Sequence, residues 1–387
     1  MHYFILAGEA SGDLHGAGLI QELRKVDADA RFSFFGGDLM AAEAGAAPSV
    51  HIRNLAYMGF CEVARHLGDI RRNLRTARGL LRERRPDALI LVDYPSFNLK
   101  IAKTARKLGI PVYYYIPPKV WAWKKWRTKT ILQLCRKVFT IFPFENDFYR
   151  TYGHARAGQV VYAGNPTVEE VGRQLSGTET HEEFLLRYRL RPNRPLVALM
   201  PGSRKGEIRA NLPVMLEATD RFTQYKAIII GAPGIDDSYY EAFKGTREIP
   251  VIREDSSPAI LKHCRGALVT SGTATLEVAL CGIPQVALYR SNGSRLAYKI
   301  MSRLLSVAYV TLPNLIAGRE IIPELLLHEC TADAVSDKLG GLLRLNADAR
   351  GSQLEGYREI ARVLTDKNAP ATAAGAIFED LKSRNQD

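Results

Sequence analysis

Residues 267–282 read ALVTSGTATLEVALCG. A short apolar run ends at the Ser-Gly-Thr turn of residues 271–273, and a helix-favouring segment with one carboxylate, Glu277, begins at once. A strand that passes through a small-residue turn directly into a helix is the repeating element of doubly wound α/β sheets, in which ligands bind just beyond the strand ends. The stretch therefore predicts an α/β protein with a ligand-binding turn.

The rest of the chain repeats this alternation of short apolar runs and longer helical patterns. Several runs are apolar at successive positions, which is typical of strands buried on both faces of a parallel sheet. The runs are YFILAG (3–8), FSFFGG (32–37), ALILVD (88–93), VYYYI (112–116), KVFTIF (137–142), VVYAG (160–164), LVALMPG (196–202), KAIIIGA (226–232), VIRED (251–255), GALVTSG (266–272) and PQVALYR (284–290).

The pattern predicts two domains. Between about residues 164 and 195 a polar stretch with proline-rich punctuation interrupts the alternation. We therefore expect two Rossmann-like domains, residues 1–170 and 190–364, whose strand-end loops face one another across a cleft. The segment of about 365–387 predicts a C-terminal helix that returns to the first domain.

The composition is that of a globular protein with an anionic partner. The 387 residues are 46% hydrophobic and 24% charged, with a net charge of +12, which favours nucleic acid, a phosphorylated ligand or an anionic membrane surface. The five cysteines and the histidines show no metal-ligand spacing, so we expect reduced thiols, a cytoplasmic location and no metal. No run of 18 apolar residues occurs, so any membrane contact is expected to be peripheral.

Two strand-end motifs of the first domain carry candidate ligand-binding residues. LAGEASGDLHGAGLI (6–20) places Gly8, Ser11 and Gly12 in a strand-to-helix turn whose free N–H groups attract anions or sugar hydroxyls. The glycine and cap that any such turn needs explain the same residues. Asp93 stands between a buried strand and a helix that starts at a proline, so it is either a general base for an acceptor hydroxyl or a helix cap.

The second domain offers two turns suited to a diphosphate. In ALMPGSRKGEIRANLP (198–213), a Pro-Gly-Ser turn precedes Arg204, whose guanidinium suits phosphate oxygens; a solvated interdomain turn is the alternative. In the opening stretch Gly272 permits close approach, Thr273 and Thr275 offer hydroxyls, and the helix directs its positive end at an anion. Glu277 suits ribose hydroxyls or stabilises the helix start. The chain has no Walker sequence, which disfavours kinases and ATPases.

Two basic segments of the first domain have several interpretations. Residues 58–82 carry an apolar stripe at helical spacing beside an arginine stripe, which suits a helix lying on an anionic bilayer or a surface helix with its apolar side in the core. IPPKVWAWKKWRTKTI (116–131) interleaves tryptophans with cations, as in nucleic-acid stacking sites, sugar platforms, interfacial anchors or a buried helix start.

Seven motifs, in order and over nearly the whole chain, resemble the lipid-A-disaccharide synthase family, glycosyltransferase family 19, which has the two-Rossmann GT-B fold. They are AGEASGD (7–13), MGFCEV (58–63), LVDYPSFN (91–98), VWAW (120–123), PGSR (201–204), SGTATLE (271–277) and LPNLIAGRE (312–320). The resemblance implies an inverting transfer of 2,3-diacylglucosamine from its UDP derivative to the 6-hydroxyl of 2,3-diacylglucosamine 1-phosphate. It implies the β-1′,6-linked disaccharide 1-phosphate and UDP as products, and no metal or other cofactor.

The resemblance also implies roles for individual residues. The expected catalytic residues are Asp93 as general base, Arg204 on the diphosphate, Glu9, and Asn314 facing the cleft. The others are, for UDP, Ser203, Ser271, Gly272, Thr273, Thr275 and Glu277; for the acceptor side, Ser11 and Gly12; and for membrane contact, Met58, Phe60, Val63, Leu67, Ile70, Arg71, Leu74, Arg75, Arg78 and Arg82. Asn165 and Pro117 depart from the family pattern, in which His and Ser are frequent.

The expected partners are the two acylated substrates and the anionic inner-membrane surface, with a homodimer as an option and no nucleic acid. Two alternatives stay open. Another GT-B enzyme of UDP-GlcNAc, an epimerase or a lipid-linked GlcNAc transferase, shares the nucleotide half and differs in the acceptor. A basic nucleic-acid-binding protein needs the cations and tryptophans but no carboxylate at a strand end, and its affinity falls steeply with salt.

Overall fold

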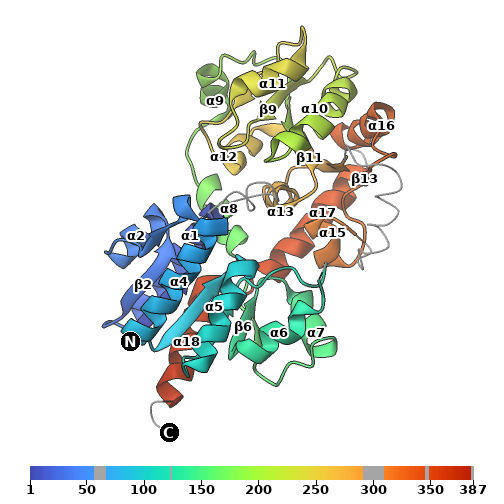
Figure 1. Ribbon diagram of the computed structural model, residues 1–387. Helices are drawn as coiled ribbons and strands as arrows, with labels where there is room; N and C mark the ends of the chain where they lie inside the picture. Colours follow the sequence, from blue (N-terminus) through green and yellow to red (C-terminus); the bar gives the residue numbers. More distant parts are fainter. Residues whose placement is uncertain (56–66, 123, 291–308, 345–347, 385–387) are drawn as a thin grey trace. The chain divides into compact units, whose positions relative to one another are not determined.

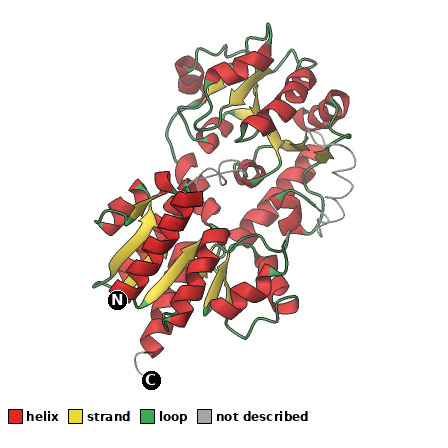
Figure 2. Cartoon of the chain, in the orientation of Figure 1, coloured by secondary structure: helices red, strands yellow, loops and turns green. Residues whose placement is uncertain are grey.

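The structure, a computed structural model, describes residues 1–55, 67–122, 124–290, 309–344 and 348–384. It divides into two compact units, Met1–Pro166 with Thr365–Asp387, and Thr167–Leu364. Each unit is built on its own parallel β-sheet flanked by helices (Figure 1 and Figure 2). The predicted α/β class with two Rossmann-like units is confirmed.

The sheet of the first unit has seven described strands in the order β3-β2-β1-β4-β5-β6-β7, all of them parallel. The strands are β1 (His2–Leu6), β2 (Arg31–Gly36), β3 (Val50–His51), β4 (Ala88–Val92), β5 (Val112–Tyr115), β6 (Lys137–Thr140) and β7 (Val160–Tyr162). The helices of this unit are α1 (Ala10–Val26), α2 (Asp38–Ala44), the short η1 (Ile52–Asn54), α4 (Leu67–Arg84), α5 (Pro95–Lys107), α6 (Arg127–Leu134), α7 (Pro143–Thr151) and α18 (Ala369–Arg384).

Both faces of this sheet are covered, because successive residues of a strand point to opposite faces. In β1, Tyr3 and Ile5 pack in a cluster with residues of α1 and α18, whereas Phe4 and Leu6 pack in a second cluster with residues of α4 and α5. All four side chains are buried. This explains why residues 3–6 of the strand are hydrophobic at successive positions.

The C-terminal helix α18 belongs to the first unit, as the sequence predicts. It packs against α1, and its Asp380 accepts a hydrogen bond of 2.6 Å from the hydroxyl of Tyr113 in β5. Asp380 also forms an ion pair with Arg136. The residues that carry the chain back, just before α18, are tightly fitted, because a Cβ added to Gly164 would lie 2.1 Å from the carbonyl oxygen of Lys367.

The second unit has a sheet of six described strands in the order β10-β9-β8-β11-β12-β13, again all parallel. The strands are β8 (Leu196–Met200), β9 (Lys226–Ile230), β10 (Val251–Ile252), β11 (Cys264–Thr270), β12 (Gln285–Tyr289) and β13 (Glu324–Leu326). The helices are α8 (Pro166–Leu175), which begins at the last residue of the first unit, α9 (His181–Arg187), α10 (Lys205–Thr219), α11 (Asp237–Lys244), α12 (Ser257–Leu261), α13 (Thr273–Leu280), α15 (Leu312–Ala317), α16 (Ala332–Leu343) and α17 (Asp348–Leu364).

Each sheet has one point at which the strand order reverses. In the first unit β1 and β4 are neighbours, and in the second unit β8 and β11 are neighbours. After one of the two strands the chain connects to one half of the sheet, and after the other it connects to the other half. The loops at their carboxyl ends therefore diverge and leave room for a ligand. The candidate residues after β1, β4, β8 and β11 all lie at these two reversal points.

Candidate functional site

Asp93 follows the last residue of β4 at the reversal point of the first sheet. Its side chain is half-buried, and burial raises the pKa of the carboxyl. The ammonium of Lys119 and the backbone N–H of Tyr94 oppose this increase, because both favour the charged form. The raised pKa makes Asp93 a stronger base than an exposed aspartate while a nearby cation keeps its ionised form accessible.

The turn after β1 presents two of its predicted residues and uses a third for packing. Ser11 is exposed in the first turn of α1, and Glu9 is half-buried at the residue before that helix. Gly12 is buried, and a Cβ added to it would lie 3.2 Å from the Cβ of Ala7. The prediction that Gly12 lines the acceptor side is therefore wrong: its lack of a side chain lets α1 pack closely on β1.

Asp13, which the sequence analysis did not single out, has a structural role in the same motif. Its buried carboxylate accepts hydrogen bonds from the backbone N–H groups of Gly37, Leu39 and Met40, at 2.6, 3.1 and 3.1 Å. These groups belong to the start of α2, whose first N–H groups have no partner within the helix. Asp13, the last residue of the AGEASGD motif, therefore caps the N-terminus of α2.

The turn after β8 holds Arg204 at the start of α10. Gly202 has a φ of 118°, and the backbone N–H of Ser203 donates to Glu207 Oε2 at 3.0 Å. The guanidinium of Arg204 is 3.1 Å from Glu207 Oε1, and its side chain is 70% exposed. Glu207, a residue that sequence reasoning missed, thus orders both predicted UDP-binding residues of this turn while the guanidinium stays accessible.

The turn after β11 separates outward-facing from inward-facing side chains. Thr273 is exposed at the first residue of α13, and Ser271 is half-buried, with its hydroxyl 3.3 Å from the carbonyl of Val310. Thr275 is buried, and its hydroxyl donates to the carbonyl of Gly272 at 2.8 Å. The prediction of a phosphate contact for Thr275 is corrected, because this hydroxyl supports the turn from inside.

Glu277 lies near a second carboxylate. Burial raises the pKa of Glu277, and the charge of Glu170, in α8, raises it further. Glu170 is itself partly buried, with a raised pKa, and it accepts a hydrogen bond of 3.2 Å from Gln174. The sequence did not indicate this pair, because the two residues are far apart along the chain.

Asn314, expected to face the cleft, is instead 0% exposed. Its Oδ1 accepts from the backbone N–H groups of Ile321 and Ile322 at 2.7 and 2.9 Å, and its Nδ2 donates to the carbonyl of Ile322 at 2.9 Å and to Glu324 Oε1 at 2.8 Å. Both ends of the amide are therefore engaged inside the second unit. The predicted orientation is wrong, because the half-buried Glu324 carboxylate and the backbone at 321–322 hold the side chain inside the unit.

Part of the predicted membrane contact lies in the core. Leu74 is buried and Ile70 packs against the same cluster, together with other residues of α4. Arg71, Arg75 and Arg82 are exposed, and Arg78 is half-buried. The prediction that Leu74 contacts the membrane is therefore wrong. The alternative of a surface helix with its apolar side in the core holds for the described part of α4.

Other membrane residues cannot be placed. Met58, Phe60 and Val63 lie outside the described residues, and so does the side chain of Leu67. Within the described ranges, none of the helices combines the length and the apolar character of a membrane span.

The tryptophan-rich segment contributes a buried polar cluster to the first unit. Trp121 is buried, and its Nε1 donates to Glu145 Oε1 at 2.9 Å. Burial raises the pKa of Glu145 to about 7, although donors including Ile141 and Phe142 oppose the shift. Trp126 is 64% exposed. The interpretation of a buried tryptophan thus applies to Trp121 but not to Trp126.

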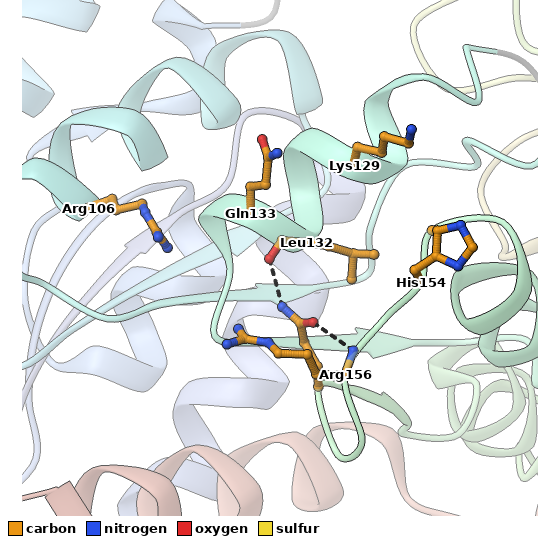
Figure 3. A pocket seen from close by; sticks show the side chains of 8 residues that line it. Arg106, Lys129, Leu132, Gln133, His154 and Arg156 are labelled. Carbon is orange, nitrogen blue, oxygen red and sulfur yellow. Dashed lines mark hydrogen bonds between the residues drawn. The ribbon is translucent and has the colours of Figure 1, made fainter.

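A basic pocket of about 490 Å³ opens in the first unit away from these residues (Figure 3). Gln159 lines the pocket, accepting from the backbone N–H of Arg156 at 3.2 Å and donating to the carbonyl of Leu132 at 2.7 Å. The pocket is formed by the end of α5, by α6 and by the loop that leads into β7, so it lies where strands begin. Asp93 follows a strand end, and this pocket is therefore separate from the candidate site. Its lining residues are Arg106, Lys129, Leu132, Gln133, Gly153, His154, Arg156 and Gln159.

Solved structures with a similar fold include enzymes of UDP-sugars. UDP-GlcNAc 2-epimerase from Neisseria meningitidis bound to UDP-GlcNAc has a TM-score of 0.63 at 12% identity, over 99% of this chain and 100% of that chain. The glycotransferase of kitacinnamycin has a TM-score of 0.63 at 15% identity, over 98% and 99%. At such identities the similarity shows the GT-B type of fold alone.

The sequence comparisons are more specific. The lipid-A-disaccharide synthases of Myxococcus xanthus and Geobacter sulfurreducens are each 37% identical to this chain, over 382 and 383 residues, which is 97% of this chain and 97% and 96% of those proteins. A family model described as lipid-A-disaccharide synthetase matches residues 3–369. Since both matches extend over nearly the whole length, the chain belongs to the lipid-A-disaccharide synthetase family.

Proposed function

We propose that this chain is an inverting glycosyltransferase that forms a lipid A disaccharide. It transfers 2,3-diacylglucosamine from UDP to the 6-hydroxyl of 2,3-diacylglucosamine 1-phosphate. The observation that carries the proposal is the full-length similarity to lipid-A-disaccharide synthases at 37% identity. The placement of a carboxylate and of an arginine turn at the two sheet reversal points supports it.

Asp93 is the general base of the proposed reaction. Inversion takes one displacement: the 6-hydroxyl oxygen attacks the anomeric carbon as the bond from that carbon to UDP breaks. The Asp93 carboxylate takes the proton of the attacking hydroxyl, and UDP leaves with the bonding electron pair. The raised pKa of Asp93 favours this transfer, because proton abstraction becomes easier as the pKa of the base rises.

The second unit holds the UDP. Negative charge grows on the diphosphate as the bond breaks, so fixed donors near it lower the barrier. The exposed guanidinium of Arg204 and the N-terminus of α13, at Gly272 and Thr273, supply such donors. Glu277 accepts from the ribose hydroxyls, and Ser203 and Ser271 complete the phosphate turns.

The first unit binds the acceptor, with Glu9 and Ser11 beside Asp93 at the reversal point. Because both substrates carry acyl chains that partition into bilayers, we propose that this unit contacts the anionic inner-membrane surface from the cytoplasmic side. The exposed Arg71, Arg75 and Arg82 of α4 support this contact, since each cation near an anionic surface contributes about 1 kcal/mol.

The reaction is tested by incubating the protein with UDP-2,3-diacylglucosamine and 2,3-diacylglucosamine 1-phosphate and following disaccharide and UDP. Asp93→Ala is expected to lower turnover by roughly 10²- to 10⁴-fold and to leave the UDP affinity unchanged. Asp147→Ala removes an exposed carboxylate of α7 and serves as the control with normal turnover. A folded protein that forms no disaccharide, but epimerises UDP-GlcNAc, would refute the proposal.

The membrane contact is tested by sedimentation with vesicles. The triple variant Arg71→Ser, Arg75→Ser, Arg82→Ser is expected to lose binding to phosphatidylglycerol vesicles. Removal of three exposed lysines from α5, at positions 100, 103 and 107, is expected to retain binding. Equal binding by the arginine variant and the wild type would show that these arginines are merely solvated.

A further inference from the structure

The main-chain carbonyl of Asp93 accepts hydrogen bonds from two buried side chains of different elements. The hydroxyl of Tyr114, in β5, donates to it at 2.8 Å, and Asn98 Nδ2, in α5, donates to it at 2.7 Å. Both side chains are 0% exposed. Burial holds the pKa of the Tyr114 hydroxyl well above its ordinary value, so this group stays protonated and donating throughout the physiological range.

The backbone at this point has an unfavourable conformation. Asp93 and Tyr94 each have a φ of 44°, in the left-handed region that residues with a Cβ seldom adopt. Tyr94 also precedes Pro95, and a following proline further restricts the backbone. Such a conformation persists only where the surroundings hold it in place. Two successive residues of this kind at a strand end therefore require specific contacts.

Those contacts connect the turn to the rest of the sheet. Asn98 Nδ2 also lies 3.3 Å from the carbonyl oxygen of Leu6 and 3.2 Å from that of Val92, the last residues of β1 and β4. The ring of Tyr94 packs on Gly8, where an added Cβ would lie 2.4 Å from ring atoms. The amide of Asn98 thus ties the turn to both strands at the reversal point, and Gly8 leaves space for the Tyr94 ring.

We infer that Asn98 and Tyr114 are positioning residues of the transfer reaction: by holding the carbonyl of Asp93 they maintain the left-handed turn and so fix the direction of the Asp93 carboxylate. The inference rests on the proposed role of Asp93 as general base. Without the two donors the turn can relax to an ordinary backbone conformation, which swings the carboxylate away from its acceptor. A shift of about 1 Å at a reacting group costs up to roughly a hundredfold in rate.

The chain offers a matched control for Tyr114 at the preceding residue. Tyr113 is also fully buried in β5, and its hydroxyl also makes one short hydrogen bond, 2.6 Å to Asp380 in α18. Tyr113→Phe and Tyr114→Phe therefore remove the same group from the same strand. Only Tyr114→Phe removes a donor to Asp93, so the comparison isolates the effect on the base from the general effect of losing a buried hydroxyl.

Steady-state kinetics and the pH profile of the full-length protein test the inference. Tyr114→Phe is expected to lower kcat roughly ten- to a hundredfold, with KM for the UDP-sugar unchanged, whereas Tyr113→Phe keeps kcat within about twofold. The acid limb of the Tyr114→Phe profile is expected at higher pH, because a relaxed turn takes the N–H of Tyr94 away from the carboxylate, and that bond lowers the pKa of Asp93.

A second variant and a second background complete the test. Asn98→Ala is expected to act like Tyr114→Phe; if it does not fold, the tyrosine pair decides the outcome alone. In an Asp93→Ala background, Tyr114→Phe is expected to have no further effect on kcat, since a positioning residue acts through the base. Equal kcat for the two tyrosine variants, or an undiminished effect of Tyr114→Phe without Asp93, would overturn the inference. Normal turnover of Asp93→Ala itself would instead refute the proposed base.

Discussion

Replacing Asn314 with alanine is expected to destabilise the second unit locally. The substitution removes two hydrogen bonds from the N–H groups of Ile321 and Ile322 and two donated to Ile322 and Glu324, at 2.7 to 2.9 Å. A buried neutral hydrogen bond contributes about 1 kcal/mol and one to a charged group about 1.5–3 kcal/mol. We therefore expect the free energy of local opening of residues 321–324 to fall by about 4.5–6 kcal/mol.

Hydrogen exchange of the Ile321 and Ile322 amides measures this loss directly. Because about 1.4 kcal/mol corresponds to a factor of ten, the protection of both amides is expected to fall by roughly 10³- to 10⁴-fold, or to the limit set by the wider opening of the unit. Asn193→Ala, at an exposed position of the same unit, serves as the control and should leave both amides unchanged.

The resemblance to the family implies instead that Asn314 faces substrate. If Asn314→Ala abolished turnover while the two amides kept their full protection, the side chain would have to act on substrate, and the structural role derived from its burial would be refuted. If protection and activity fall together, the loss of activity follows from the loss of order next to the turn after β11.

Three other substitutions separate structural from chemical roles. Lys119→Met removes a charge that lowers the pKa of Asp93, so the acid limb of the pH profile of kcat/KM should move to higher pH. An unmoved limb would contradict an electrostatic effect of Lys119 on Asp93. Glu145→Gln places an amide N–H₂ group, which cannot accept, next to the buried N–H donors that now bond the carboxylate. The free energy of unfolding should fall by roughly 1–3 kcal/mol, measured as a lower Tm. An unchanged Tm would contradict the role of these hydrogen bonds. Thr275→Val should change the UDP affinity by less than about threefold, because the hydroxyl is bonded to Gly272; calorimetry showing a loss above tenfold would restore Thr275 as a phosphate ligand.

Most of the sheet could be predicted from the sequence because its signals are local. Each longer strand is a run of adjacent apolar residues, and each run quoted from the sequence contains a strand of the structure. The two short strands β3 and β13 were missed. They are the segments VH and ELL, each of which contains a polar residue, and they are strands because neighbouring strands pair with them.

The direction of a side chain was harder to predict, because it depends on partners far along the chain. The apolar stripe of α4 has the same spacing whether it packs on a sheet or lies on a bilayer, so the sequence could not decide where Leu74 points. Glu145 accepts a hydrogen bond from Trp121, which lies 24 positions earlier in the chain, and Glu170 lies near Glu277, which is more than one hundred positions later. Neither pair leaves a pattern within any single motif.

Motifs that identify a family therefore combine two kinds of residue that the sequence alone does not separate. Asp13, Asn98 and Asn314 each stand inside a motif, yet each is buried and bonds backbone groups of other segments. Asp93 and Thr273 stand in the same kind of motif, but Asp93 is only half-buried and Thr273 is exposed. Loss of either kind reduces activity, but only loss of the first kind also reduces the protection of nearby amides. Activity measurements on motif residues consequently assign chemistry only when they are paired with a local measure of stability.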